Sequence, residues 1–221
     1  MSGLFAAIDP FPLVSVESYD YARAKMHAAA ADHWLGFDIE RIESQILQKS
    51  PVLPGTGRWH GLPAQSLLTP YIEIRLILEL CQPKPGQIVA DLGCAYGRMG
   101  LVIDRHFPRV HFAGYEIEAL RVAEAQRILQ RLNNPDLKVT HCDLADPSYS
   151  LEAADFYFIY DYGTVQNIQR TLSQLQGRAR SRPLVVIGRG RGTRHVIQTL
   201  HPWLCEVNPP THTETFSIYR S

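Results

Sequence analysis

The stretch ADLGCAYGRMG, residues 90–100, decides the fold of this protein. It follows the apolar run QIVADL and precedes the amphipathic run RMGLVIDRHF, so it predicts a buried strand, a glycine-rich turn and a helix. A dinucleotide fingerprint needs a glycine at position 95, where the methyl group of Ala95 crowds an approaching pyrophosphate. Asp91 adds a negative charge at the mouth of the turn. The turn therefore favours a cationic ligand over a dinucleotide.

Strand and helix patterns alternate on both sides of this turn. Further strands are expected within 110–116, 137–144, 155–162 and 182–190, with helices within 97–107, 117–133, 165–176 and 193–202 between or after them. Alternation of this kind predicts a doubly wound α/β fold with a mainly parallel sheet. The segment 203–220 contains the short link NPPTH, which is too short for a crossover, so the last two of seven strands should form an antiparallel hairpin.

The first 68 residues differ from the rest. Residues 18–49 predict one or two helices with a break at Gly36, and the proline- and glycine-rich segment that follows predicts a loop. A helix is expected from Thr69, with Thr69 as its cap and Pro70 at its first position. We therefore divide the chain into an N-terminal helical extension, 1–68, and a Rossmann-like domain, 69–221. Arg58, Trp59 and His60 are candidate lid residues in the loop.

Composition excludes several classes of protein. The formal net charge of +0 gives no global case for binding nucleic acid or an anionic membrane. No apolar run is long enough for a membrane span, and the N-terminus does not look like a signal peptide. The four cysteines form no CxxC pair, and neither they nor the histidines have metal-ligand spacing. We expect a cytoplasmic protein with free thiols and no metal site.

Three acidic residues follow expected strands in a recognisable order. Asp91 precedes the glycine turn, Glu116 ends the second strand and Asp143 follows the third. With these residues the chain, from about 69 to 221, resembles the class I, seven-strand S-adenosylmethionine-dependent methyltransferases. The resemblance implies that the motif residues, the ribose-binding acid, the acid near the adenine and their neighbours bind S-adenosylmethionine. These are Asp91, Gly93, Ala95, Gly97, Glu116, Ile117, Asp143 and Leu144.

Within that group, the run TPYIEIRLILEL and the following motif are most similar to the seven-strand protein-lysine methyltransferases. The resemblance implies that Thr69 and Tyr71 approach the methionine end of the cofactor and that Glu73 binds its ammonium. It also implies a protein lysine as the methyl acceptor. The chain lacks the apolar anchor of the membrane-associated lysine methyltransferases and the Asn-rich motif of the nucleosome-directed one.

The fourth strand ends in FIYDYG, 158–163, where acceptor contacts are expected. Asp161 is a candidate to take a proton or orient an amine, and Tyr160 and Tyr162 are candidate ring faces for a cationic lysine. Strand alternation puts the two tyrosines on one side and Asp161 on the other. Core packing of these aromatic residues is the alternative.

Other functions stay open at this stage. An arginine cluster surrounds the fifth strand and makes an RNA backbone or an acidic protein a possible partner; its members are Arg178, Arg180, Arg182, Arg189, Arg191 and Arg194. Methyl transfer to RNA or a small molecule is one alternative to lysine. A non-catalytic protein that binds S-adenosylmethionine is another. Asp91 and the glycine spacing disfavour a Rossmann oxidoreductase.

Overall fold

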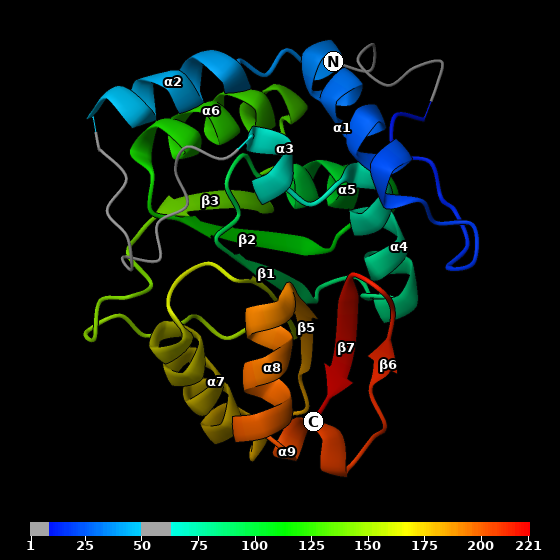
Figure 1. The fold of residues 1–221 in the computed structure, drawn as a ribbon, viewed down its shortest axis with the longest axis vertical. Coiled ribbons are helices and arrows are strands. Elements are labelled where there is room, and N and C mark those ends of the chain that lie inside the picture. The colour runs from blue at the N-terminus through cyan, green and yellow to red at the C-terminus, as the bar shows by residue number, and fades with distance from the viewer. Residues whose placement is uncertain (1–8, 50–62) are drawn as a thin grey trace.

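The described residues, 9–49 and 63–221 of a computed structural model, form one sheet with helices on both faces (Figure 1). The sheet has seven strands in the order β3-β2-β1-β4-β5-β7-β6, which confirms the doubly wound fold. The strands are β1 (Ile88–Leu92), β2 (His111–Glu116), β3 (Leu137–His141), β4 (Phe156–Tyr160), β5 (Val185–Arg189), β6 (Thr211–His212) and β7 (Phe216–Arg220). The order reverses between β1 and β4, and ligands of such sheets bind at the carboxyl ends beside this switch point.

Strands β1 to β5 are parallel, whereas β7 is antiparallel to both β5 and β6. The antiparallel hairpin at the C-terminal end of the sequence was expected within 203–220. Its first strand, β6, has only two residues and begins at Thr211. Residues Trp203–Glu206 form a short helix, α9, because Pro202 already has helical backbone angles. Pro209 and Pro210 have no N–H to donate to a ladder, so β6 begins only at Thr211.

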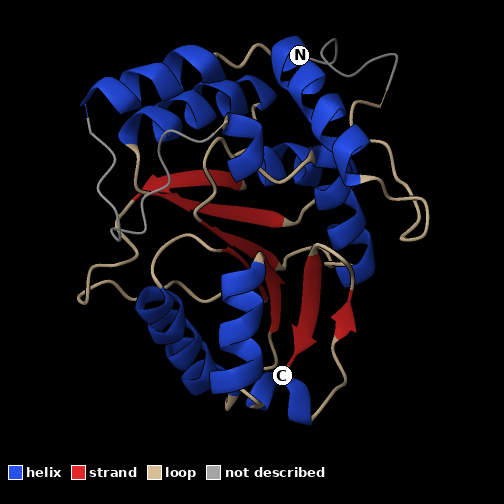
Figure 2. Cartoon of the chain, in the orientation of Figure 1, coloured by secondary structure: helices blue, strands red, loops and turns tan. Residues whose placement is uncertain are grey.

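Helices cover the two faces of the sheet separately (Figure 2). One face carries α4 (Tyr71–Cys81), α5 (Arg98–His106) and α6 (Ala119–Leu129), which continues into the 3-10 turn η1 (Gln130–Leu132). The other carries α7 (Val165–Ala179), α8 (Arg191–Leu200) and α9. Successive residues of β4 alternate between the two resulting cores: Phe156 and Phe158 pack in the first, Tyr157 and Ile159 in the second.

The N-terminal helices α1 (Tyr21–Leu35) and α2 (Ile39–Lys49) join the first core. Asp20 caps α1 by accepting the Arg23 N–H, and Gly36 ends it with φ 81°, which confirms the expected break. Helix α1 packs on α4, and α2 packs on α6. None of the helices in the described ranges is both long and apolar enough to cross a membrane.

A short helix, α3 (Ala64–Leu67), leads into α4. Helix α4 begins at Tyr71, one residue later than expected, and Pro70 rather than Thr69 is its N-cap, with no side-chain hydrogen bond. The candidate lid residues at 58–60 lie outside the described residues. The division of the chain at 68/69 stays a prediction.

Candidate functional site

The glycine turn between β1 and α5 has backbone angles that favour glycine at two of its positions. Gly93 and Gly97 have φ of 86° and 70°, and Ala95 also has a positive φ of 47°. A Cβ atom at Gly93 would lie 2.7 Å from the Cβ of Tyr162, so the turn packs against the loop after β4 without room for a side chain. The turn therefore brings the ends of β1 and β4 together at the switch point of the sheet.

A pocket lies against this turn, between α3, α4 and the sheet. Its lining includes Leu68, Thr69, Asp91, Ala95, Arg98 and Tyr160. Asp91 is only 7% exposed, and no hydrogen-bond donor of the described residues reaches its carboxylate. Burial, and next the negative charge of Glu116, raise the pKa of Asp91 to about 8. The pocket thus contains a buried acid that has no hydrogen-bond donor among residues 9–49 and 63–221.

Glu116 ends β2 beside the turn and ties two loops together. Its Oε2 accepts the Ala95 N–H at 2.9 Å, and its Oε1 accepts the Glu118 N–H at 2.8 Å. Burial raises the pKa of Glu116, while Arg121, 3.8 Å away, acts in the opposite direction. Each carboxylate oxygen keeps a lone pair for one more donor, as a sugar diol would require.

The remaining adenine-side candidates sit at the ends of β2 and β3, which are neighbours in the sheet. Ile117 and Leu144 are half-buried, and Asp143 is exposed. The Oδ1 of Asp143 accepts the Ala145 N–H at 2.7 Å, which fixes the start of the loop after β3. The motif residues, Glu116 and these three residues thus share the carboxyl edge of the sheet, as the sequence predicts for one ligand site.

The candidates at the start of α4 divide into two groups. Thr69 lines the pocket, and its carbonyl oxygen accepts an N–H of Arg98 at 3.0 Å. Tyr71 is fully buried away from the pocket lining, where its hydroxyl donates to Asp32 at 2.8 Å.

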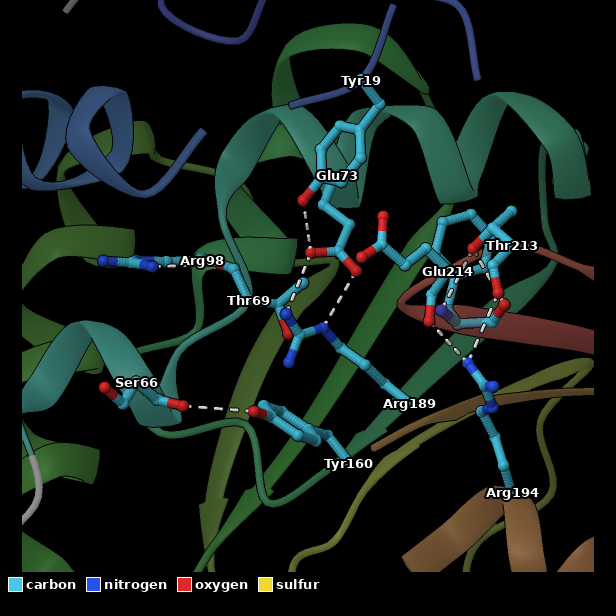
Figure 3. Close-up of polar contacts among 11 residues, drawn as sticks. Tyr19, Ser66, Thr69, Glu73, Arg98, Tyr160, Arg189, Arg194, Thr213 and Glu214 are labelled. Atoms are coloured by element: carbon cyan, nitrogen blue, oxygen red, sulfur yellow. Dashed lines mark hydrogen bonds and ion pairs between the residues drawn. The ribbon is translucent and has the colours of Figure 1, made fainter. Parts of the chain in front are cut away.

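Glu73 departs from its expected role. It is fully buried, and its two oxygens accept hydrogen bonds from Nε and Nη2 of Arg189, both at 3.0 Å (Figure 3). The Tyr19 hydroxyl donates a third bond at 2.8 Å. Because these partners occupy its carboxylate, Glu73 is not positioned to bind a cofactor ammonium in this arrangement.

The strand-four candidates are also engaged by the protein. Tyr160 lines the pocket, but one face of its ring is covered by the Arg189 guanidinium, 4.1 Å from the ring centroid. Asp161 has φ 36°, and its Oδ1 accepts the N–H and the hydroxyl of Thr193, both at 2.7 Å, at the start of α8. The Tyr162 hydroxyl contacts α7 at Asn167 O, 3.3 Å away. The sequence could not show these contacts, because their partners lie on other elements.

The arginine cluster does not act as one surface. Arg178 and Arg182 bond to Leu151 O and Asp155, and Arg194 donates to Glu214 O at 2.9 Å. Arg189 is in β5 and buried, so the expected anion-binding loop GRGRG is instead the end of β5 and the first turn of α8. Arg180 and Arg191 are exposed at positions on either side of β5.

Buried ion pairs that the sequence did not predict hold the N-terminal helices α1 and α2 against the rest of the protein. Asp32 of α1 pairs with Arg98, which also donates to Gln65 Oε1 at 2.9 Å. Glu43 of α2 accepts two bonds from Arg121, at 2.8 and 2.9 Å. The partners are 66 and 78 positions apart, so no local pattern points to them.

A model of the methyltransferase small domain family matches residues 73–156. Ribosomal RNA small subunit methyltransferase C of Pasteurella multocida is 31% identical over 103 residues, which are 47% of this chain and 28% of that protein. The chain thus spans less than a third of this curated relative.

Two solved structures are similar. One is precorrin-6y C5,15-methyltransferase from Geobacter metallireducens, with 14% identity and a TM-score of 0.54 over 72% of this chain and 92% of the other. The other is an RNA methyltransferase from Salinibacter ruber in complex with S-adenosyl-L-homocysteine, with 19% identity and a TM-score of 0.49 over 69% and 90%. This chain has the class I methyltransferase fold.

Proposed function

We propose that this protein is an S-adenosylmethionine-dependent methyltransferase whose Asp91 carboxylate holds the cationic end of the cofactor. The observation that carries the proposal is the buried Asp91 carboxylate, which lines the pocket without a donor from the described residues. An unpaired buried carboxylate is costly, and a cationic ligand relieves that cost. S-adenosylmethionine carries an ammonium and a sulfonium and has no phosphate, so it fits this acid better than a dinucleotide does.

The other cofactor contacts follow from the same edge of the sheet. Glu116 would accept the ribose hydroxyls with the lone pairs left by its two backbone bonds. Ile117 and Leu144 would flank the adenine, with Asp143 at its rim. When bound, the cofactor supplies an electrophilic methyl group, and the chain's task is to hold an acceptor in line with it.

A protein lysine is the acceptor that the charges at this edge favour. The loops that follow β1 to β5, namely 93–97, 117–118, 142–155, 161–164 and 190, contain no lysine or arginine. They contain acids, of which Glu118, Asp143 and Asp146 lie nearest the ends of β2 and β3. Of the arginines that begin the following helices, Arg98 is paired with Asp32, and Arg191 is exposed. Such an edge attracts a cationic side chain and repels a polyanion.

The acceptor amine must lose its proton before it attacks. Asp161 is engaged with α8, so we propose that the proton leaves to water and that no side chain of FIYDYG acts as the base. A lysine amine with an ordinary pKa of about 10.4 then predicts a transfer rate that rises roughly tenfold for each pH unit below that value.

RNA is the second candidate acceptor, and one observation favours it: the relative that is 31% identical over 103 residues is named as a ribosomal RNA methyltransferase. The matched segment is 28% of that protein, so this likeness concerns only part of it.

Transfer of a radiolabelled methyl group into a cell lysate, followed by separation into protein, RNA and small molecules, tests these proposals. Label in protein that is recovered as methyl-lysine supports the first acceptor, and label in RNA supports the second. Titration calorimetry with S-adenosylmethionine and with NAD tests the cofactor separately. Heat with S-adenosylmethionine but no label in any fraction would favour a binding protein without catalysis. Absence of heat with S-adenosylmethionine would contradict the whole proposal.

A further inference from the structure

The ion pair between Glu73 of α4 and Arg189 of β5 is the most deeply buried charge pair in the described chain that the proposed chemistry does not use. Glu73 is 0% exposed and Arg189 is 3% exposed. Burying two charges costs about as much as their attraction returns, so apolar residues of similar size would be as stable. The pair is therefore better explained by what it positions than by what it stabilises.

What the pair positions is the ring of Tyr160. The two parallel hydrogen bonds to Glu73 fix the plane of the Arg189 guanidinium, whose carbon lies 4.1 Å from the Tyr160 ring centroid. The N-terminal segment closes the other side: the Tyr19 hydroxyl donates to Glu73, and the Tyr21 ring lies 5.5 Å from the guanidinium. Tyr160 is thus held on a rigid, desolvated cation.

Tyr160 in turn holds the helix that covers the pocket. Its hydroxyl donates to the carbonyl oxygen of Ser66 in α3 at 3.1 Å (Figure 3). The next two residues, Leu67 and Leu68, line the pocket together with Tyr160. On its other side α3 is held by Arg98, which bonds to Gln65. Helix α3 has only four residues, so these outside contacts decide where it sits.

We propose that Arg189 is a positioning residue for the cofactor: it fixes Tyr160, and the Tyr160 hydroxyl fastens α3 over the bound cofactor. This inference rests on the proposed function, because it assumes that the cofactor occupies the pocket between α3 and the glycine turn. The Tyr160–Ser66 hydrogen bond keeps α3 in place over the pocket, and its strength sets how fast the product S-adenosylhomocysteine dissociates. The expected acceptor role of Tyr160 gives way to this role.

The test uses two readouts on the full-length protein. The first is hydrogen–deuterium exchange of residues 64–68 without any ligand, where the Ser66 N–H donates to Pro63 O at 2.7 Å. The second is the dissociation rate of S-adenosylhomocysteine by stopped flow. Tyr160→Phe removes one hydrogen bond to α3 and keeps the ring, so both rates should rise about fivefold, the usual worth of one such bond.

Variants of the ion pair test the positioning step. Arg189→Lys keeps a charge for Glu73 but loses the planar face, so it should fold and raise both rates in the same direction as Tyr160→Phe. The double variant Glu73→Leu with Arg189→Met removes both charges and should do the same without leaving a buried ion unpaired. Adding Tyr160→Phe to either variant should change the two rates little further, because the Tyr160–Ser66 hydrogen bond is already weakened.

Tyr157→Phe is the matched control. Tyr157 is on the same strand, and its hydroxyl donates to Glu152 O on the other face of the sheet. This variant should lower the melting temperature but leave the exchange of 64–68 unchanged. Wild-type rates of exchange and release in both Tyr160→Phe and Arg189→Lys would overturn the inference. A wild-type protein that does not bind S-adenosylhomocysteine would instead overturn the proposed function, and the exchange data would still decide whether Arg189 fastens α3.

Discussion

Replacing Asp91 by Asn should stabilise the ligand-free protein and weaken its binding of the cofactor. The folded-state pKa of Asp91 is about 8, against 3.8 for an ordinary aspartate, because the carboxyl is buried and faces Glu116. A group whose folded pKa is raised contributes its full stability below the unfolded pKa, and this contribution is lost as the pH rises towards the folded pKa. The stability of the ligand-free protein therefore falls as the pH rises from 3.8 to 8, because Asp91 stays protonated in the folded state while it ionises in the unfolded state.

The two pKa values set the size of the effect. The difference between these two pKa values corresponds to at most roughly 6 kcal/mol above pH 8. Asparagine is also polar and retains part of the burial cost, so we expect Asp91→Asn to gain about 2–3 kcal/mol at pH 8.5. For a chain of this length that is an increase of roughly 4–12 °C in melting temperature. At pH 4 the gain should shrink to under about 1 kcal/mol, because Asp91 is then protonated in the folded state and only partly ionised in the unfolded state.

Thermal unfolding of both proteins by calorimetry at pH 4 and pH 8.5, without ligand, measures the difference. The contributions of the other titrating groups to the pH dependence of stability are the same in variant and wild type, so they cancel in the difference. Isothermal titration with S-adenosylmethionine should show at least about a tenfold loss of affinity in the variant, because a charge-assisted contact is lost. A variant that is less stable than wild type at pH 8.5, or equally stabilised at both pH values, would refute the reasoning about the buried carboxylate.

Three further predictions concern the same edge of the sheet. Gly93→Ala should lower the free energy of unfolding, measured in urea, by more than about 2 kcal/mol, because the added Cβ meets Tyr162. The control Gly86→Ala has a similar φ of 84° but no atom within 4 Å of the added Cβ, so it should lower that free energy by only about 1 kcal/mol. Equal losses in the two variants would contradict the close contact. Asp161→Ala should lose about 0.5–2 kcal/mol of stability, because its carboxylate accepts the Thr193 N–H in the first turn of α8, and it should keep methyl transfer within a few-fold. A loss of activity by about a hundredfold would restore its catalytic role. Glu116→Gln should weaken S-adenosylmethionine binding about tenfold in calorimetry, since an amide replaces a carboxylate acceptor, and unchanged affinity would exclude Glu116 from the ribose site.

The grouping of the candidate cofactor residues at one edge of the sheet could be predicted, because its signals are local. The glycine turn needs particular backbone angles, and Gly93 and Gly97 have them. Asp91, Glu116 and Asp143 come at or just after the ends of parallel strands, and parallel strands share one carboxyl edge. The contacts of Tyr160 and Asp161 could not be predicted, because their partners, Arg189 and Thr193, lie about 30 positions away.

The sequence by itself determined the alternation of strands and helices, the turn at 93–97 and the acidic edge, since each depends on residues that are close together in the chain. The tertiary structure alone decided which charges are free. Glu73 and Asp161 look available in the sequence and are paired in the fold, whereas Asp91 is buried without a donor among the described residues. The physical reason is that pairing depends on which elements the sheet order brings together. The Glu73–Arg189 contact joins residues 116 positions apart.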